Sequence, residues 1–345
     1  MIRVQTKNAS SNLPVLIRVS LGTGAVLGLL RSRLDAAPTT AYLMTHQRGR
    51  CRANCLFCPQ AEKSQSRLDM LSRVSWPAYP TWQVLERIGQ VQMEGGSTIK
   101  RICLQALNYS GVFDDLESLI ITAKQLTNVP ISVSCQPLNT QNMRRIAEAG
   151  AERITVPLDA ATEELFDETK GASAGGPYRW TNQFELLKDA VSIFGRGRVS
   201  THLIAGLGES EREMVSTIQQ CVDLGVLPAL FAFTPVRGTP MESRSQPSIE
   251  AYRRIQVART LILQGTTMIE MMRFGVGGEL LDFGVDERTV RRVVLSCKPF
   301  LTSGCPDCNR PYYNEKPGGP IYNYPRSMTE REVSEVMTQL GLNEV

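Results

Sequence analysis

Short β-rich runs alternate with amphipathic helical runs through the middle of the sequence, and this alternation limits the folds that the chain can adopt. Alternation of this kind predicts a parallel sheet covered by helices. The expected strands are Thr40–Thr45, Thr98–Gln105, Pro130–Ser134, Arg153–Pro157, Val199–Ala205, Ala229–Thr234 and Met271–Val276. The expected helices include Trp82–Met93, Asn139–Ala149 and Glu209–Leu224.

Six to eight strand–helix units within roughly 250 residues predict an α/β fold of the (β/α) TIM-type barrel class. A doubly wound sheet is the weaker alternative, because no glycine-rich dinucleotide fingerprint follows the first expected strand. In a barrel, functional residues gather in the loops at the C-terminal ends of the strands. Such residues are therefore expected directly after the strands.

The chain is expected to divide into a helical lead-in (residues 1–39), the barrel (residues 40–284) and an irregular C-terminal extension (residues 285–345). Within the extension, the segment Pro299–Pro325 is rich in Pro, Gly, Tyr and Asn and has almost no hydrophobic periodicity. A last helix is expected over Thr329–Leu340, because Thr329 and Glu332 have the spacing of a capping box. This helix is expected to pack on the barrel and to hold the irregular segment in place.

Hydrophobic and charge patterning argue against a membrane or nucleic-acid-binding protein. The apolar stretch Leu13–Leu30 is interrupted by Arg18 and three glycines, so it is too short and broken for a membrane span. No signal-peptide cleavage site clearly follows it, and a cytoplasmic location is expected. The net charge of +4 arises from 38 basic and 34 acidic residues without a long run of either sign. Such a balance does not indicate a dedicated nucleic-acid surface.

Six of the nine cysteines fall into two close groups, which indicates metal binding in a reducing compartment. The first group, Cys51, Cys55 and Cys58, follows the first expected strand. Three thiolates so close together can hold three irons of a four-iron cluster and leave the fourth iron open. A structural zinc site is the alternative, but it requires four closed ligands, and neither His46 nor His202 has zinc-finger spacing from these cysteines.

The first cysteine group has the spacing C-x3-C-x2-C, with Phe57 just before the last cysteine. This pattern resembles the signature of radical S-adenosylmethionine (SAM) enzymes, and the chain from Thr40 to about Leu301 resembles biotin synthase and its relatives. Further matching segments follow in the expected order. They are Gly95–Thr98 before the second strand, Val156–Thr162 after the fourth and Leu203–Glu209 at the fifth.

The resemblance implies a [4Fe–4S] cluster on Cys51, Cys55 and Cys58, which binds SAM through its open iron and cleaves it to methionine and a 5′-deoxyadenosyl radical. An electron donor such as ferredoxin is implied as well. By this resemblance Asp159 is the carboxylate that binds the ribose of SAM. The backbone of the fifth-strand segment is the part that holds the adenine. The SAM-binding residues implied in this way are Phe57, Gln105, Asp159, Ile204, Gly206 and Glu209.

The second cysteine group consists of Cys297, Cys305 and Cys308 in the irregular extension. Three cysteines on a proline-braced loop suit a second, auxiliary [4Fe–4S] cluster. A zinc knuckle is the alternative, because CxxC pairs commonly bind zinc. The segments Gly304–Glu315 and Pro317–Pro325 resemble the tail of archaeal-type lipoyl synthases, which are two-protein systems.

A position inside the barrel is the other candidate for a second cluster. Biotin synthase holds one there on three cysteines and an arginine, and the resemblance puts Cys103, Cys135 and Arg273 at three of these positions. Ser200 occupies the remaining cysteine position, and Pro157 replaces a substrate-binding asparagine. These departures leave both that cluster and a biotin substrate open. Cys103 and Cys135 are equally compatible with small buried hydrophobic residues.

The resemblance implies a radical SAM sulfurtransferase of the lipoyl synthase type, which inserts sulfur at unactivated carbons of a protein-bound octanoyl chain in lipoate biosynthesis. No acid–base group can remove a hydrogen from such carbons, so a radical cofactor has to supply the difficult step. The implied partners are an octanoyl-carrying lipoyl-domain protein and a possible second radical SAM subunit. Biotin formation, a related reaction without sulfur transfer, and a non-catalytic iron–sulfur subunit remain the alternatives.

Overall fold

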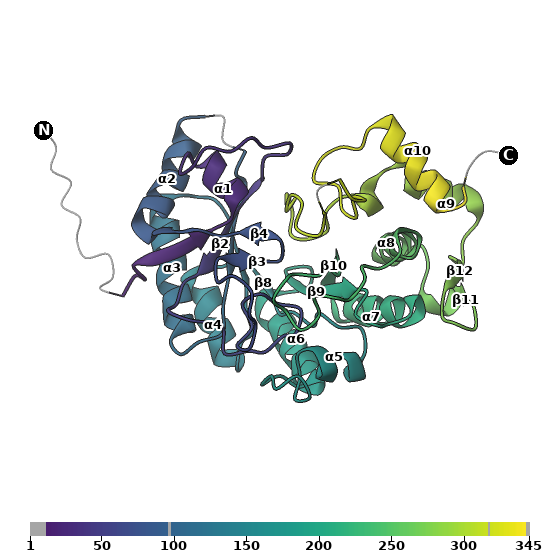
Figure 1. Ribbon diagram of the computed structural model, residues 1–345, viewed down its shortest axis with the longest axis horizontal. Coiled ribbons are helices and arrows are strands. Elements are labelled where there is room, and N and C mark those ends of the chain that lie inside the picture. Colours follow the sequence, from purple (N-terminus) through teal and green to yellow (C-terminus); the bar gives the residue numbers. More distant parts are fainter. Residues whose placement is uncertain (1–11, 96–97, 317, 343–345) are drawn as a thin grey trace, which may run out of the picture.

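The computed structural model describes residues 12–95, 98–316 and 318–342 as an α/β protein built on an eight-stranded sheet (Figure 1). The strand order is β10-β9-β8-β7-β6-β2-β1-β5. The strands are β1 (Leu16–Val19), β2 (Thr40–Thr45), β5 (Ala78–Pro80), β6 (Arg101–Gln105), β7 (Ile131–Ser134), β8 (Arg153–Thr155), β9 (Val199–Ala205) and β10 (Val226–Ala232). The strands from β2 to β10 are parallel, whereas β1 pairs antiparallel with β2 and β5.

Helices alternate with the parallel strands and cover the outer face of the sheet (Figure 1). They are α2 (Thr81–Met93), α3 (Val112–Leu126), α4 (Thr140–Ala149), α5 (Glu163–Thr169), α6 (Trp180–Phe194), α7 (Glu211–Leu224) and α8 (Ile249–Leu263). Side chains alternate between the two faces of a strand. In β6, Ile102 and Leu104 therefore join the outer hydrophobic core, while Arg101, Cys103 and Gln105 line interior cavities.

The sheet curves into an incomplete barrel, because side chains from five parallel strands line one cavity. They are Met44 of β2, Gln105 of β6, Ser134 of β7, Ile204 of β9 and Phe231 of β10. Among the described strands, β10 and β5 remain at opposite edges of the sheet. The predicted α/β class with a parallel central sheet is thus confirmed, while the described strands leave the ring open on one side.

The first six predicted strands are present in the main sheet, whereas the seventh is not. The bounds of β2 and β9 are those predicted. The seventh predicted strand is wrong as part of the barrel, because it contains only the short β11 (Arg273–Phe274), which pairs with β12 (Leu280–Asp282) in a separate two-stranded sheet. The short strands β3 (Met70–Leu71) and β4 (Val74–Ser75) form another such pair. Gly96 and Ser97, from the segment expected before the second strand, lie outside the described residues.

The N-terminal region is not a purely helical lead-in. Its residues Leu16–Val19 form β1, and only then does the short helix α1 (Leu21–Val26) follow. Ile17 and Val19 are β-branched and fully buried, which favours an extended backbone at this edge of the sheet. No helix within the described ranges is both long and apolar enough to cross a membrane.

The C-terminal extension packs against α8 and then returns to the barrel. It contains α9 (Glu287–Leu295), the 3₁₀ turn η2 (Lys298–Phe300) and α10 (Glu330–Gln339), after the 3₁₀ turn η1 (Ile269–Met271). The predicted capping box of α10 is confirmed. Residues 303–314, here called the tail loop, cross the open side of the barrel (Figure 1). Ser303 Oγ accepts from Leu230 N of β10 at 2.7 Å, and Asn309 Oδ1 accepts from Thr39 N, next to β2, at 3.0 Å.

Candidate functional site

A cavity of about 250 Å³ lies at the C-terminal ends of the parallel strands. It brings together residues that are far apart in the sequence. The predicted site residues that line it are Cys51, Cys55, Phe57, Cys58, Gln105, Asp159 and Ile204. This is the end of an α/β barrel at which active sites are built. The cavity is therefore the candidate active site.

Hydrogen bonds hold the cysteine loop at this cavity in a defined shape. Cys58 N donates to the Cys55 carbonyl at 2.9 Å, which closes a tight turn between the two ligands. Asn108 N, from the loop after β6, donates to Cys51 Sγ at 3.1 Å. An N–H directed at sulfur favours the charged thiolate over the thiol. The loop is thus shaped for thiolates that bind metal.

The donor set of this loop fits a cluster with one open iron. Burial raises the pKa of all three thiols, that of Cys58 to about 12, and buried thiols of this kind lose their protons when a metal binds. In the described part of the chain, no three His, Cys, Asp or Glu side chains converge closely enough to hold one metal ion. A four-iron cluster makes a different demand, because each of its thiolates binds a separate iron.

Asp159 lies directly after β8 and presents its side chain to the cavity. Its backbone is left-handed, with φ of 69°. Asp159 N donates to His202 O at 2.8 Å, and Ile204 N donates to Asp159 O at 2.7 Å, which fixes this conformation against β9. Asp159 does not cap α5, because Thr162 does so by accepting from Leu165 N at 3.2 Å. Its carboxylate is left for an interaction inside the cavity.

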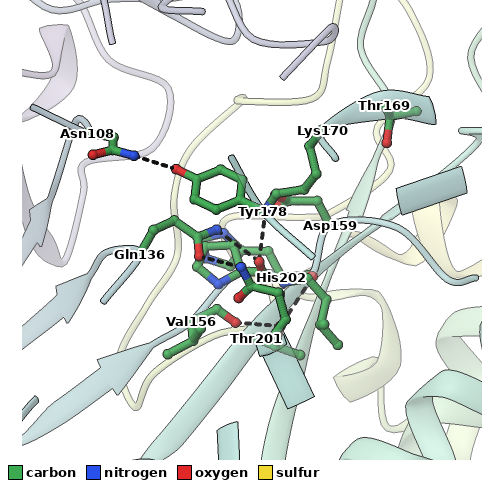
Figure 2. A network of polar contacts seen from close by, with 12 residues as sticks. Asn108, Gln136, Val156, Asp159, Thr169, Lys170, Tyr178, Thr201 and His202 are labelled. Atoms are coloured by element: carbon green, nitrogen blue, oxygen red, sulfur yellow. Dashed lines mark hydrogen bonds and ion pairs between the residues drawn. The ribbon is translucent and has the colours of Figure 1, made fainter. Parts of the chain in front are cut away.

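Lys170 is the partner of the Asp159 carboxylate, and no sequence pattern predicted this role. Lys170 Nζ lies 2.6 Å from Asp159 Oδ2 and 2.9 Å from the Pro157 carbonyl (Figure 2). It also lies over the rings of Phe166 and Tyr178, at 5.4 and 5.1 Å from their centroids. Lys170 follows α5 and precedes a glycine-rich turn, so helical or strand periodicity gives no signal for it. The ammonium also opposes the effect of burial on the nearby thiol of Cys55, whose pKa burial raises.

Two residues predicted to bind SAM, Gly206 and Glu209, shape the turn after β9. The carboxylate of Glu209 accepts from Gly206 N at 2.6 Å and from Leu207 N at 3.0 Å, so it closes the turn after β9. The described lining of the cavity includes Ile204 of this segment but neither Gly206 nor Glu209. Gly206 has φ of 104°, and a Cβ there would lie 2.8 Å from Cδ of Pro247. The turn therefore needs glycine for its backbone and its packing.

The second cysteine group is divided in the structure. Cys305 and Cys308 reach into the barrel from the tail loop and line a smaller cavity of about 30 Å³ together with Cys103 of β6. Cys297 lies at the beginning of η2, where its Sγ is 3.6 Å from the Leu295 carbonyl. The structure thus brings Cys103, rather than Cys297, to the cavity that Cys305 and Cys308 line.

Of the other residues considered for a cluster inside the barrel, Ser200 lines the smaller cavity, whereas Cys135 and Arg273 lie elsewhere. Cys135 lines the larger cavity and belongs to the outer hydrophobic core. Arg273 lies on β11, where its side chain is 71% exposed and 3.6 Å from Asp282. The arginine that lines both cavities is Arg310 of the tail loop. Its position follows from the tertiary path of the tail loop, which no local sequence signal encodes.

Comparison with known proteins agrees with this geometry. The family described as "Radical SAM superfamily" matches residues 48–221, about half of the chain. A biotin synthase from Synechococcus elongatus is 24% identical over 250 residues, which cover 69% of this chain and 72% of that protein. Among solved structures, methylornithine synthase (PylB) has a TM-score of 0.50 at 12% identity, covering 75% of this chain and 82% of PylB.

A second structural neighbour is the FeFe-hydrogenase maturase HydG from Carboxydothermus hydrogenoformans. It has a TM-score of 0.50 at 16% identity over 66% of this chain and 52% of HydG. The chain thus spans about half the length of HydG. At this level of identity, both structural neighbours bear on the fold alone.

Proposed function

The chain belongs to the radical SAM superfamily, and we propose that it inserts sulfur at unactivated carbons of an octanoyl chain carried on a protein, as a lipoyl synthase-type sulfurtransferase. In this proposal an octanoyl-carrying lipoyl-domain protein is the substrate and a ferredoxin-like protein the electron donor. A second radical SAM subunit is a possible partner.

The observation that carries the proposal is the adjacency of two groups of thiols inside one barrel. Cys51, Cys55 and Cys58 line the larger cavity, whereas Cys103, Cys305 and Cys308 line the smaller one. Both cavities share the lining residues Ser134, His202, Phe231 and Arg310. An octanoyl carbon in the larger cavity would therefore lie next to the second group, where an auxiliary iron–sulfur cluster would hold sulfide. Sulfur insertion requires this arrangement, because the carbon radical must meet sulfur before it meets solvent.

The residues around the larger cavity have different roles in this chemistry. When bound, the [4Fe–4S] cluster and SAM supply a 5′-deoxyadenosyl radical that abstracts hydrogen from the substrate. Asp159 accepts hydrogen bonds from the ribose hydroxyls, and Lys170 orients its carboxylate through the ion pair between them. Gln105 Nε2 is buried without a hydrogen-bond partner among the described residues, so it is available to donate to the cofactor. Phe57 and Phe233 make part of the wall apolar and exclude water.

Biotin synthase activity is the second candidate, supported by the relatives at about one quarter identity. That reaction also joins sulfur to unactivated carbons, but its substrate is a small ring compound rather than an acyl chain on a protein. A non-catalytic iron–sulfur subunit is the candidate from another class. Cleavage of SAM by the isolated chain would exclude it.

The proposal is tested with full-length protein that is reconstituted anaerobically with iron and sulfide. The protein is incubated with SAM, a reductant and a lipoyl-domain peptide that carries octanoyl-lysine, and a parallel reaction contains dethiobiotin. We expect 5′-deoxyadenosine together with sulfur on the octanoyl chain, measured by mass spectrometry. Biotin in the parallel reaction, with the octanoyl peptide unchanged, would favour the second candidate. Production of 5′-deoxyadenosine without sulfur on either compound would contradict both.

A further inference from the structure

We propose that Cys103, Cys305 and Cys308 are the ligands of the second iron–sulfur cluster, and that Arg310 is the positioning residue beside it. One ligand comes from the barrel sheet and two from the tail loop. This inference rests on the proposed function, which needs a source of sulfur beside the substrate. It removes Cys297 from the ligand set.

The register of the sheet places the two tail thiols on either side of Cys103. Tyr42 of β2 and Ser132 of β7 are the residues paired with Cys103 on the neighbouring strands. Adjacent strands lie about 4.8 Å apart. The hydroxyl of Ser132 lies 3.3 Å from Cys305 Sγ, and that of Tyr42 lies 3.3 Å from Cys308 Sγ. The three thiols thus approach the small cavity from three directions.

The tail loop holds its two cysteines in a fixed relationship. Cys308 N donates to the Cys305 carbonyl at 3.0 Å. A Cβ at Gly304 would lie 3.0 Å from Cys308 Sγ, so the loop folds back closely on the second cysteine. Ser303 Oγ ties the beginning of the loop to Leu230 N of β10 at 2.7 Å. The tail loop therefore carries the thiols of Cys305 and Cys308 into the barrel interior.

Arg310 carries a positive charge into this interior without a carboxylate to balance it. Its guanidinium lies 5.5, 5.2 and 5.1 Å from the ring centroids of Tyr42, Phe231 and Tyr313. Among the described residues it has no carboxylate ion pair, and its buried Nε has no hydrogen-bond partner. An unbalanced buried charge is costly. Thiolate ligands of a cluster would supply the missing negative charge.

Arg310 also separates the two cavities. The cavity among the three thiols has a volume of only about 30 Å³, and Arg310 lines both this cavity and the larger one. A four-iron cluster needs more room than that, so cluster loading would require the side chains around the smaller cavity to move apart. Because Arg310 lines both cavities, its positive charge would lie between the cluster and the substrate, where it can tune the cluster without being one of its ligands.

The test uses the full chain in a background that lacks Cys51, Cys55 and Cys58, each replaced by Ala, so that only the second site can bind iron. After anaerobic reconstitution, iron and sulfide are counted, and the reduced protein is examined by electron paramagnetic resonance (EPR). We expect about four irons per chain in the background and in its Cys297→Ala derivative. Adding Cys103→Ser, Cys305→Ser or Cys308→Ser should remove most of this iron, while circular dichroism confirms that each variant is folded. Arg310→Lys should retain the iron and shift the EPR signal.

Loss of iron in the Cys297→Ala derivative, with full retention in the Cys103→Ser derivative, would overturn the inference. So would one zinc per chain and no iron in the background. An EPR signal unchanged by Arg310→Lys would remove Arg310 from the proposal. The proposed function is judged separately: a second cluster on these three cysteines, with neither octanoyl peptide nor dethiobiotin gaining sulfur, would refute the function and leave the ligand assignment standing.

Discussion

Lys170 Nζ lies 2.6 Å from Asp159 Oδ2, and the two side chains are only 1% and 11% exposed. Each charge is removed from water and is balanced by the other. Removal of one partner from such a pair leaves an uncompensated buried charge. Because Asp159 also lines the larger cavity, the pair links the stability of the barrel mouth to the binding of SAM.

Replacement of Asp159 by Asn should therefore affect stability and binding together. We expect the free energy of unfolding to fall by about 3–5 kcal/mol, as measured by urea denaturation. The double variant Asp159→Asn, Lys170→Met should recover part of this loss, because it removes both charges. Both variants should bind SAM about 1.5–3 kcal/mol more weakly, since a charged acceptor for the ribose is missing. Unchanged SAM affinity in the folded double variant would show that Asp159 has only a structural part.

Gly176 keeps Lys170 in place through the close approach of two backbone segments. A Cβ at position 176 would lie 2.0 Å from the Lys170 carbonyl oxygen, so Gly176→Ala must displace the backbone at Lys170. We expect a loss of about 1–3 kcal/mol in stability, the usual cost of overpacking, and weaker binding of SAM in a calorimetric titration. The control is Gly22→Ala, because the nearest atom to a Cβ there is Pro38 Cδ at 3.5 Å. Equal changes in stability and SAM binding in Gly176→Ala and Gly22→Ala would contradict the explanation that Gly176 keeps Lys170 in place.

Arg253 holds the segment after the tail loop against α8. Its side chain is buried to 1% exposure and donates to the carbonyls of Tyr322 and Ile321. Because hydrogen bonds of a charged group contribute about 1.5–3 kcal/mol each, Arg253→Met should lower the free energy of unfolding by at least about 3 kcal/mol. It should also make the C-terminal extension more sensitive to limited proteolysis and reduce iron at the second site. Arg331→Met is the control, since Arg331 is 86% exposed, and should change stability by less than about 0.5 kcal/mol. A tail that stays resistant in Arg253→Met would contradict the predicted anchoring.

Much of the barrel could be predicted from the sequence because its signals are local. The run Thr40–Thr45 is a strand with the predicted bounds, and Gly150 and Gly225 end α4 and α7 in the left-handed conformation, as predicted for C-terminal glycines. The strand β1, which lies between β2 and β5, was missed because its four residues are followed by a short helix. An apolar run of this length does not distinguish a strand from a helix. Met271–Val276 has strand-like composition, but tertiary packing leaves it outside the main sheet.

The candidate site was predictable where its residues follow a motif and not where they depend on the path of the chain. Cys51, Cys55 and Cys58 are close in sequence, so their common cavity follows from spacing alone. The contact of the Glu209 carboxylate with the backbone of its own turn was not predicted, because the motif gives the residue and not the direction of its side chain. The approach of the tail loop to Cys103, and the interior position of Arg310, depend on contacts between residues about 200 positions apart, which no sequence window contains.

Labelled sulfide provides the most direct test of the account, in which two thiol groups in one barrel combine SAM cleavage with sulfur insertion. The full chain and its Cys305→Ser variant are reconstituted with isotopically labelled sulfide and incubated with SAM, reductant and the octanoyl peptide. We expect the unchanged chain to form 5′-deoxyadenosine and to transfer the label to the peptide, as measured by mass spectrometry. The variant should still form 5′-deoxyadenosine, because the first cysteine group is intact, but no labelled carbon–sulfur bond. Equal labelling of the peptide by both proteins, or 5′-deoxyadenosine without labelled peptide from the unchanged chain, would contradict the account.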